Sequence, residues 1–101
     1  MRRKTLSAYV VFIRDNTLDQ DEMVTYADKA GKAHGNHPIK PLAFYGDLET
    51  LEGPEAEGVV IIEFPSTDAA HAWYDSPEYQ EAKQHRLKGA TYRVLLVKGV
   101  D

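Results

Sequence analysis

The chain lacks cysteine, long apolar runs and any large basic cluster. Without cysteine it can form no disulfide, has no thiolate nucleophile and offers no cysteine ligand to zinc or an iron–sulfur cluster. Its longest apolar run has six residues, far short of the roughly 20 that a membrane-spanning helix needs. We therefore expect no membrane partner, and the absence of disulfide chemistry is consistent with a cytoplasmic location.

The basic residues do not gather into a nucleic-acid surface. Twelve Lys and Arg residues are scattered among sixteen Asp and Glu residues, giving a net charge of −4, whereas phosphate binding needs a clustered basic face. The one basic cluster, residues 2–4, is followed by no long apolar region and is interpreted as a solvated terminus rather than a secretory signal. We expect no nucleic-acid partner and a disordered tail over residues 1–6.

Size and composition indicate one globular domain, which we assign to residues 7–101. With 101 residues, 43% of them hydrophobic and 28% charged, the chain can bury one core. No repeat at the length of a solenoid unit is present.

Apolar periodicity predicts four strands and two helical regions. The first helix shows it well: Met23, Tyr26 and Ala30 form one apolar stripe, Asp19 is placed to cap the helix, and Glu22 is placed to bond back to the cap. The predicted elements, in order, are a strand over residues 7–13, a helix from Asp19 to a stop at Gly35, an edge strand over residues 42–52 interrupted at Gly46, a strand over residues 59–64, a helix that starts at Ser66, restarts at Pro77 and ends at Gly89, and a strand over residues 92–97.

This order, βαββαβ, predicts the α+β fold known as the ferredoxin-like plait. Two split βαβ units with right-handed crossovers give a four-stranded antiparallel sheet with strand order 4-1-3-2 and both helices on one face.

The first and last predicted strands carry apolar side chains on both faces, which indicates a homodimer. Val11 and Ile13 oppose Val10 and Phe12 on the first strand, and residues 92–97 repeat the pattern on the last. An open apolar face of this size exceeds what monomers usually expose. A second copy packed sheet to sheet would cover it.

Glu63 interrupts an apolar strand and is the strongest candidate for chemistry. It shares a face with Val59 and Ile61, while the opposite face is wholly apolar. Because a lone carboxylate beneath packed helices would be costly, we expect Glu63 to point into the space between the two sheets of the dimer. There it would act as a general acid or base; the alternatives are an ion pair with an arginine such as Arg93 or Arg86, or a cap at the end of a strand.

Aromatic and basic residues that follow this strand complete the candidate site. Trp73, Tyr74 and Tyr79 fall where two helical turns meet the sheet edge; Trp73 is interpreted first as core, and the tyrosine hydroxyls as groups that reach a ligand. Arg86 shares a helical face with Tyr79 and would either anchor an anion or pair with a carboxylate such as Glu81.

The spacing of His34 and His37 in the loop after the first helix resembles part of a metal site, but no third ligand follows at a suitable spacing. We predict no metal and interpret both histidines as exposed, with His34 as a candidate at the edge of a ligand pocket.

The sequence IEFPSTDAAHAWYDSPEYQEAKQHR, with LEG at residues 51–53 before it and YRVLLVKGV after it, resembles the domain-of-unknown-function family 1330. This family belongs to the dimeric α/β-barrel superfamily, and the resemblance covers residues 7–100. It implies a ferredoxin-like protomer and a face-to-face dimer. The motif positions that carry over are Glu63, Trp73, Tyr74, Ser76, Tyr79 and Arg86, of which Ser76 is more simply a helix cap.

One segment departs from the family pattern: residues 35–38 read GNHP where a glycine pair is usual, so a pocket edge built there would differ. Superfamily relatives include cofactor-independent monooxygenases, muconolactone isomerase-like enzymes, haem-degrading proteins and stress-responsive proteins. A shared fold does not choose among these activities.

The leading hypothesis is a homodimer that binds a small organic, anionic molecule in a pocket between sheet and helices, without a cofactor. One alternative is a cofactor-independent enzyme of monooxygenase or isomerase type in which Glu63 is the acid or base, Arg86 the anion anchor, and Tyr74 or Tyr79 a hydrogen-bond donor. The other is a non-catalytic interaction module in which these residues hold the helices and the dimer together.

Overall fold

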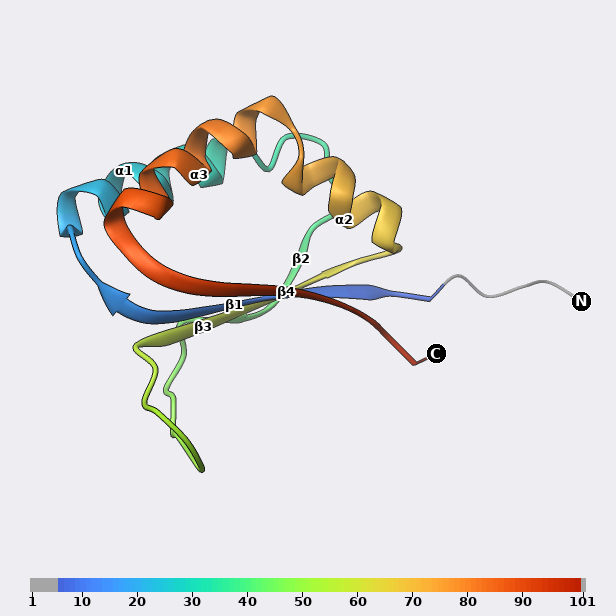
Figure 1. Cartoon of the computed structure of the whole chain (residues 1–101). Coiled ribbons are helices and arrows are strands. Elements are labelled where there is room, and N and C mark those ends of the chain that lie inside the picture. The colour runs from blue at the N-terminus through green and yellow to red at the C-terminus, as the bar shows by residue number, and fades with distance from the viewer. Residues whose placement is uncertain (1–5, 101) are drawn as a thin grey trace, which may run out of the picture.

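A four-stranded antiparallel sheet carries its helices on one face in the computed structural model, which describes residues 6–100 (Figure 1). The strand order β2-β3-β1-β4 confirms the predicted order 4-1-3-2. The tail predicted over residues 1–6 falls, apart from Leu6, outside the described residues. The elements are β1 (Ala8–Thr17), α1 (Gln20–Lys32), β2 (Lys40–Phe44), β3 (Gly58–Phe64), α2 (Thr67–Tyr74), α3 (Pro77–Gly89) and β4 (Ala90–Lys98).

Strand β1 lies at the centre of the sheet and sets its two faces. Val11 pairs with Ile61 of β3 on one side and with Leu95 of β4 on the other. The neighbouring pairs place Phe12 beside Val60, and both side chains are buried beneath the helices. This strict alternation, apolar on both faces, follows from the sequence pattern.

The sheet face away from the helices is therefore also apolar. We call it the open face; it consists of Tyr9, Val11, Ile13, Val59, Ile61, Glu63, Leu95 and Val97.

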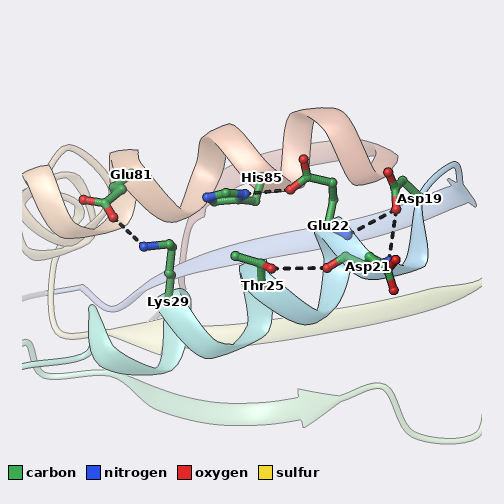
Figure 2. Close-up of polar contacts among 7 residues, drawn as sticks. All are labelled: Asp19, Asp21, Glu22, Thr25, Lys29, Glu81 and His85. Carbon is green, nitrogen blue, oxygen red and sulfur yellow. Dashed lines mark hydrogen bonds and ion pairs between the residues drawn. The ribbon is translucent and has the colours of Figure 1, made fainter.

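Helix α1 begins at the predicted cap and is attached to α3. The carboxylate of Asp19 accepts hydrogen bonds from the backbone N–H groups of Asp21, at 3.0 Å, and Glu22, at 3.3 Å (Figure 2). The predicted return bond from Glu22 to the cap is wrong, because the Glu22 carboxylate lies 2.7 Å from His85 of α3. The backbone N–H of Asp19 instead donates to Gly89 O at 3.0 Å, so the cap is satisfied by α3.

Serine caps start both helices of the second crossover. The hydroxyl of Ser66 accepts from the Ala69 N–H at 3.0 Å. The hydroxyl of Ser76 accepts from the Tyr79 N–H at 3.2 Å and donates to Trp73 O at 2.7 Å. Pro77 occupies the first turn of α3, where its missing N–H costs nothing.

Two strand boundaries differ from the prediction. The second strand covers Lys40–Phe44 rather than residues 42–52, because Tyr45 adopts a left-handed backbone conformation with φ 52° that turns the chain out of the sheet. Residues 45–57 form a loop that extends on the side of the sheet opposite the helices (Figure 1). Strand β1 continues past Ile13 to Thr17, with an irregularity between Arg14 and Asn16.

The end of the first helix also differs. Helix α1 stops at Lys32 with Ala33 as its cap, and Gly35, with φ 48°, lies in the turn that follows. Within residues 6–100 no helix has the length and hydropathy needed to cross a membrane.

A side chain at position 58 would collide with the ring of Tyr45, so only glycine fits there without a rearrangement. A Cβ added there would lie 2.6 Å from Cδ1 of Tyr45, so Gly58→Ala must displace that ring and should lower the free energy of unfolding by about 1–3 kcal/mol. Urea denaturation measures the change. Gly46→Ala is the matched control, because a Cβ there meets nothing within 4 Å and should change stability by no more than about 0.5 kcal/mol. Equal effects of the two substitutions would contradict the packing described for Tyr45.

Candidate functional site

A cavity of about 490 Å³ lies between α1 and the sheet. Helix α1 contributes one wall through residues such as Met23, Ala27 and Ala30, and the strands contribute the other through residues such as Val60 and Ile62. Five aromatic side chains complete the lining: Phe12, Tyr26, Phe44, Tyr45 and Trp73. The cavity has the size and apolar character of a small-molecule site.

No carboxylate lines this cavity, although the chain has a net charge of −4. Its polar lining consists of Arg14, Gln20, His34 and the two tyrosines. Arg14 is paired with Glu57 at 3.2 Å, and its guanidinium lies 4.9 Å from the centroid of the Tyr45 ring. The sign of the lining charge therefore favours a negative ligand over a positive one.

Arg86 is a buried cation without an acidic partner. Its exposed fraction is 4%, and none of the ion pairs within residues 6–100 includes it. Its guanidinium lies 5.9 Å from the Phe12 ring centroid and 5.4 Å from that of Tyr92. Nη2 donates to the Tyr74 hydroxyl at 3.4 Å, while Nε is buried without a hydrogen-bond partner.

Arg86 is charged at neutral pH, because a guanidinium keeps its proton in proteins. Burial lowers the pKa of Arg86, but Tyr79 and Tyr26 outweigh burial in the alkaline range where they ionise, so the pKa is raised above its ordinary value. At neutral pH both tyrosines are uncharged, and no ion pair within residues 6–100 compensates the charge of Arg86. A buried charge of this kind has a high desolvation cost.

Two tyrosine pairs lie beside the cavity. The hydroxyls of Tyr26 in α1 and Tyr79 in α3 are 2.8 Å apart, and those of Tyr45 and Tyr92 are 2.5 Å apart. Tyr79 is fully buried. Burial is the main reason that the pKa values of Tyr26, Tyr79 and Tyr92 are raised.

Trp73 belongs to the core, as predicted, and also lines the cavity. Its exposed fraction is 5%, and its ring centroid lies 4.3 Å from that of Tyr79 and 5.5 Å from that of Phe64. The indole N–H is buried without a hydrogen-bond partner among the described residues, a state that usually has an explanation such as a bound water or ligand.

The structure brings four of the six predicted site residues together: Trp73, Tyr74, Tyr79 and Arg86 form one aromatic cluster around the guanidinium. His34 lies apart from them at the cavity edge, where its Nδ1 is 3.2 Å from Gly35 O. Within residues 6–100 no group of three His, Cys, Asp or Glu side chains is placed to hold a metal ion.

Glu63 is separated from this cluster by the sheet. Its position on β3 alternates with the buried Ile62 and Phe64, so it belongs to the open face. It does not line the cavity, and its cross-strand neighbours are Tyr9 and Lys40.

The ion pairs offered as alternatives for Glu63 and Arg86 are wrong. Arg93 donates to both carboxylate oxygens of Asp15, at 3.0 and 2.9 Å, across β4 and β1. Glu81 pairs with Lys29 of α1 at 2.6 Å (Figure 2). Arg93 is thus taken by Asp15, and Glu81 by Lys29.

Sequence reasoning missed the second half of the site. The sequence pattern predicts Tyr26 only as part of an apolar stripe, Tyr45 and Tyr92 as strand residues, and Arg14 as the residue that ends the first strand. The available signal was the number of tyrosines: six in 101 residues, each with a hydroxyl that needs a partner when buried.

The fold and the cavity define the class. A βαββαβ protomer with its helices on one face and an apolar open face on the other has the ferredoxin-like fold of the dimeric α/β-barrel proteins. The chain belongs to the family described as domain of unknown function DUF1330, whose model matches residues 7–100. No curated protein matches the sequence significantly.

Solved structures share this fold at low sequence identity. A protein of unknown function from Rhodopseudomonas palustris, RPA0582, has a TM-score of 0.77 and 18% identity, covering 97% of this chain and 85% of its own. SnoaB, a cofactor-independent oxygenase from Streptomyces nogalater, has a TM-score of 0.62 and 11% identity, covering 96% and 95%. A dimeric protein of unknown function from Bacteroides fragilis has a TM-score of 0.55 and 11% identity, covering 96% and 99%.

The buried tyrosines predict a loss of stability in alkali. In the unfolded chain a tyrosine ionises near pH 10, whereas Tyr26, Tyr79 and Tyr92 in the folded state have raised pKa values. Above about pH 10 the unfolded state therefore binds fewer protons, and the free energy of unfolding should fall by about 1.4 kcal/mol per pH unit for each such tyrosine.

Tyrosinate absorbance and circular dichroism, followed together during an alkaline titration, measure this effect. These three tyrosines should ionise only as the ellipticity is lost, and Tyr26→Phe should remove one of them from that late step. Ionisation of all three near pH 10 with unchanged ellipticity would contradict their burial.

Proposed function

We propose that this protein is a homodimer that binds a small, mostly apolar organic anion in the cavity beneath α1. One observation carries the proposal: an apolar cavity that no carboxylate of residues 6–100 lines lies against Phe12 and Tyr26, and the unpaired cation of Arg86, which is not in the lining, lies 5.9 Å from the Phe12 ring centroid.

The charge of Arg86 supplies the preference for an anion. In an apolar interior a charge is weakly screened, so it acts on a ligand at the cavity wall without direct contact. An isolated buried arginine costs free energy in the empty protein. A bound anion offsets that cost, and a cation or a neutral analogue of the same shape does not.

Cavity dimensions and lining supply the apolar part of the affinity. A volume of about 490 Å³ falls within the range of about 300–1,000 Å³ that is usual for small-molecule sites. Phe12, Trp73 and the aliphatic side chains of α1 offer contact to a ring system of two fused rings. Burial of such a ligand contributes about 25 cal/mol for each Å² of apolar surface removed from water.

The open face supports the homodimer. Val97 of β4 has an exposed fraction of 53%, and Leu95 of 52%, although both lie in a continuous apolar surface with Val11 and Ile61. The loop over residues 45–57 extends on the same side and carries Leu51, which is 83% exposed. A second copy packed on this face would bury the apolar surface and Leu51 together. The fold is shared with a Bacteroides fragilis protein described as dimeric.

The enzyme hypothesis that uses Glu63 concerns a different place. Glu63 lies on the open face beside Tyr9 and Lys40, so an acid or base there would act between the two sheets of the dimer rather than in the cavity. The cavity proposal therefore assigns no role to Glu63. It differs from the interaction-module hypothesis in one testable respect, because only the cavity proposal requires that a ligand bind.

Arg86→Met tests the ligand and the role of the charge together. Melting temperatures are measured with 2-naphthoate and with its neutral isostere 2-naphthamide. The native protein should be stabilised by naphthoate, by about 2.7 kcal/mol at 100 times the dissociation constant, and less by naphthamide. Arg86→Met keeps the length of the side chain and removes a buried charge, so it should melt no lower than the native protein and bind both probes equally.

The matched control is Lys88→Met, which removes an exposed positive charge from the same helix and should leave the preference for naphthoate unchanged. The proposal fails if neither probe stabilises the native protein. It also fails if Arg86→Met retains the full preference for the anion.

Leu95→Glu tests the homodimer. The native protein should scatter light with twice the 11.4 kDa mass of the chain, and Leu95→Glu should shift it to the monomer, because it places a charge within the proposed interface. Leu87→Glu is the control: Leu87 is equally exposed, at 56%, but lies on α3 away from the open face. A monomeric native protein at micromolar concentration, or dissociation by both variants, would count against this interface.

A further inference from the structure

We propose that the cavity selects acidic hydroxyl compounds, phenols or enols, and binds them as the single-oxygen anion, because two hydroxyl chains, each a hydrogen-bonded tyrosine pair, place Tyr26 and Tyr45 at its wall. The inference rests on the proposed function, since it concerns the same cavity, and it specifies which class of organic anion binds there.

The first chain consists of Tyr79 and Tyr26, with the charge of Arg86 acting on Tyr79. Arg86 carries only donors, and its positive charge favours the arrangement in which the Tyr79 oxygen faces it and the Tyr79 proton points away. The proton of the fully buried Tyr79 needs an acceptor, and the Tyr26 oxygen, 2.8 Å away, supplies it. With Tyr79 as the donor in this pair, the proton of Tyr26 is left without an acceptor in the protein. Tyr26 lines the cavity, and that proton is available to a ligand.

The second chain consists of Tyr92 and Tyr45, whose hydroxyls lie 2.5 Å apart. The positive charge of Arg14 acts on Tyr92 and favours the arrangement in which the Tyr92 proton points toward Tyr45. When Tyr92 donates to Tyr45, the proton of Tyr45 is the one left over. Tyr45 also lines the cavity, at the end of β2, whereas Tyr26 lies on α1.

The position of Tyr45 is maintained against backbone strain. It is the one residue other than glycine with positive φ in the part of the chain that the structure describes, a conformation that costs on the order of 1 kcal/mol. Arg14 lies over its ring, and Gly58 leaves room beneath it. Strain of this kind persists where the surroundings hold a residue in place, and it is typical of functional sites.

The type of donor selects the type of anion. A carboxylate is best bound by the paired N–H groups of an arginine fork, but Nε of Arg86 is buried away from any open space and Arg14 is engaged by Glu57. The donors that reach the wall are hydroxyl groups with one proton each. Two such donors, each polarised by an arginine at the far end of its chain, suit one oxygen atom that carries a concentrated negative charge.

The protonation states agree with this assignment. Raised pKa values keep Tyr26, Tyr79 and Tyr92 protonated at neutral pH. A bound phenol whose own pKa is lower loses its proton to water first, and the tyrosines remain donors to the resulting oxygen.

The probe 4-nitrophenol tests the inference, because its ionised form is seen directly by its absorbance. The ionisation of the bound probe is titrated in the native dimer, and its ionisation constant should rise at least tenfold relative to the free probe. Tyr26→Phe and Tyr45→Phe should each reduce that increase several-fold while leaving probe binding measurable. Tyr9→Phe removes the same hydroxyl from the open face, outside the cavity, and should leave the increase unchanged.

Two results would overturn the inference. If 4-nitrophenol binds with an unchanged ionisation constant, or if naphthoate binds and 4-nitrophenol does not, the hydroxyl chains do not stabilise a single-oxygen anion, although the cavity remains an anion site. If neither compound binds, the proposed function itself fails. If Tyr26→Phe or Tyr45→Phe fails to fold, the remaining variant still tests the inference, because the two hydroxyl chains share no residue.

Discussion

Helix α1 is held by α3 rather than by the sheet, and the cavity exists because of this attachment. The backbone of Leu18 and Asp19 donates to Gly89 O at one end of the helix pair. Glu22 meets His85 and Lys29 meets Glu81 along its outer side (Figure 2), and on its inner side Tyr26 bonds Tyr79. These contacts keep α1 at a distance from β2 and β3, so the space between them is lined by side chains rather than filled by them. Since each exposed ion pair contributes little by itself, the buried tyrosine pair and the packing of Met23 against Gly89 determine how closely the two helices approach.

The polar groups near this cavity would be unfavourable in a simple core. Arg86 is buried without a carboxylate, the Trp73 indole N–H has no partner, and Tyr45 has a strained backbone. Replacement by apolar side chains of similar volume would stabilise such a core. Proteins retain groups of this kind where they serve binding or catalysis at some cost in stability. Their concentration around one cavity, rather than through the whole core, is the reason to regard the region beneath α1 as the functional part of the protomer.

The two faces of the sheet therefore differ in character. The helix face holds the cavity, the arginine and the tyrosine pairs, whereas the open face offers an apolar surface that Glu63 interrupts. This division agrees with the fold shared with RPA0582, SnoaB and the dimeric Bacteroides fragilis protein. At identities below 20%, these likenesses establish the fold and leave the ligand to be identified from the cavity itself.

The sequence by itself determined the element order, the strand order and the two-faced sheet, because these follow from local signals: the alternation of Val10, Val11 and Phe12, the Asp19 and Ser76 caps, and Pro77 at a helix start. It also placed Glu63 on the correct face, since burial beneath the helices would have been too costly. Only the tertiary structure decided how far β2 extends, because that depends on the contacts of Tyr45 with Arg14 and Gly58, far apart in sequence. It also decided against the ion pairs considered for Glu63 and Arg86, because Arg93 pairs with Asp15 and Glu81 with Lys29 across elements that no local pattern relates. The tyrosine pairs are of the same kind: Tyr26 and Tyr79 are 53 residues apart, and their hydroxyls meet only when α1 packs on α3.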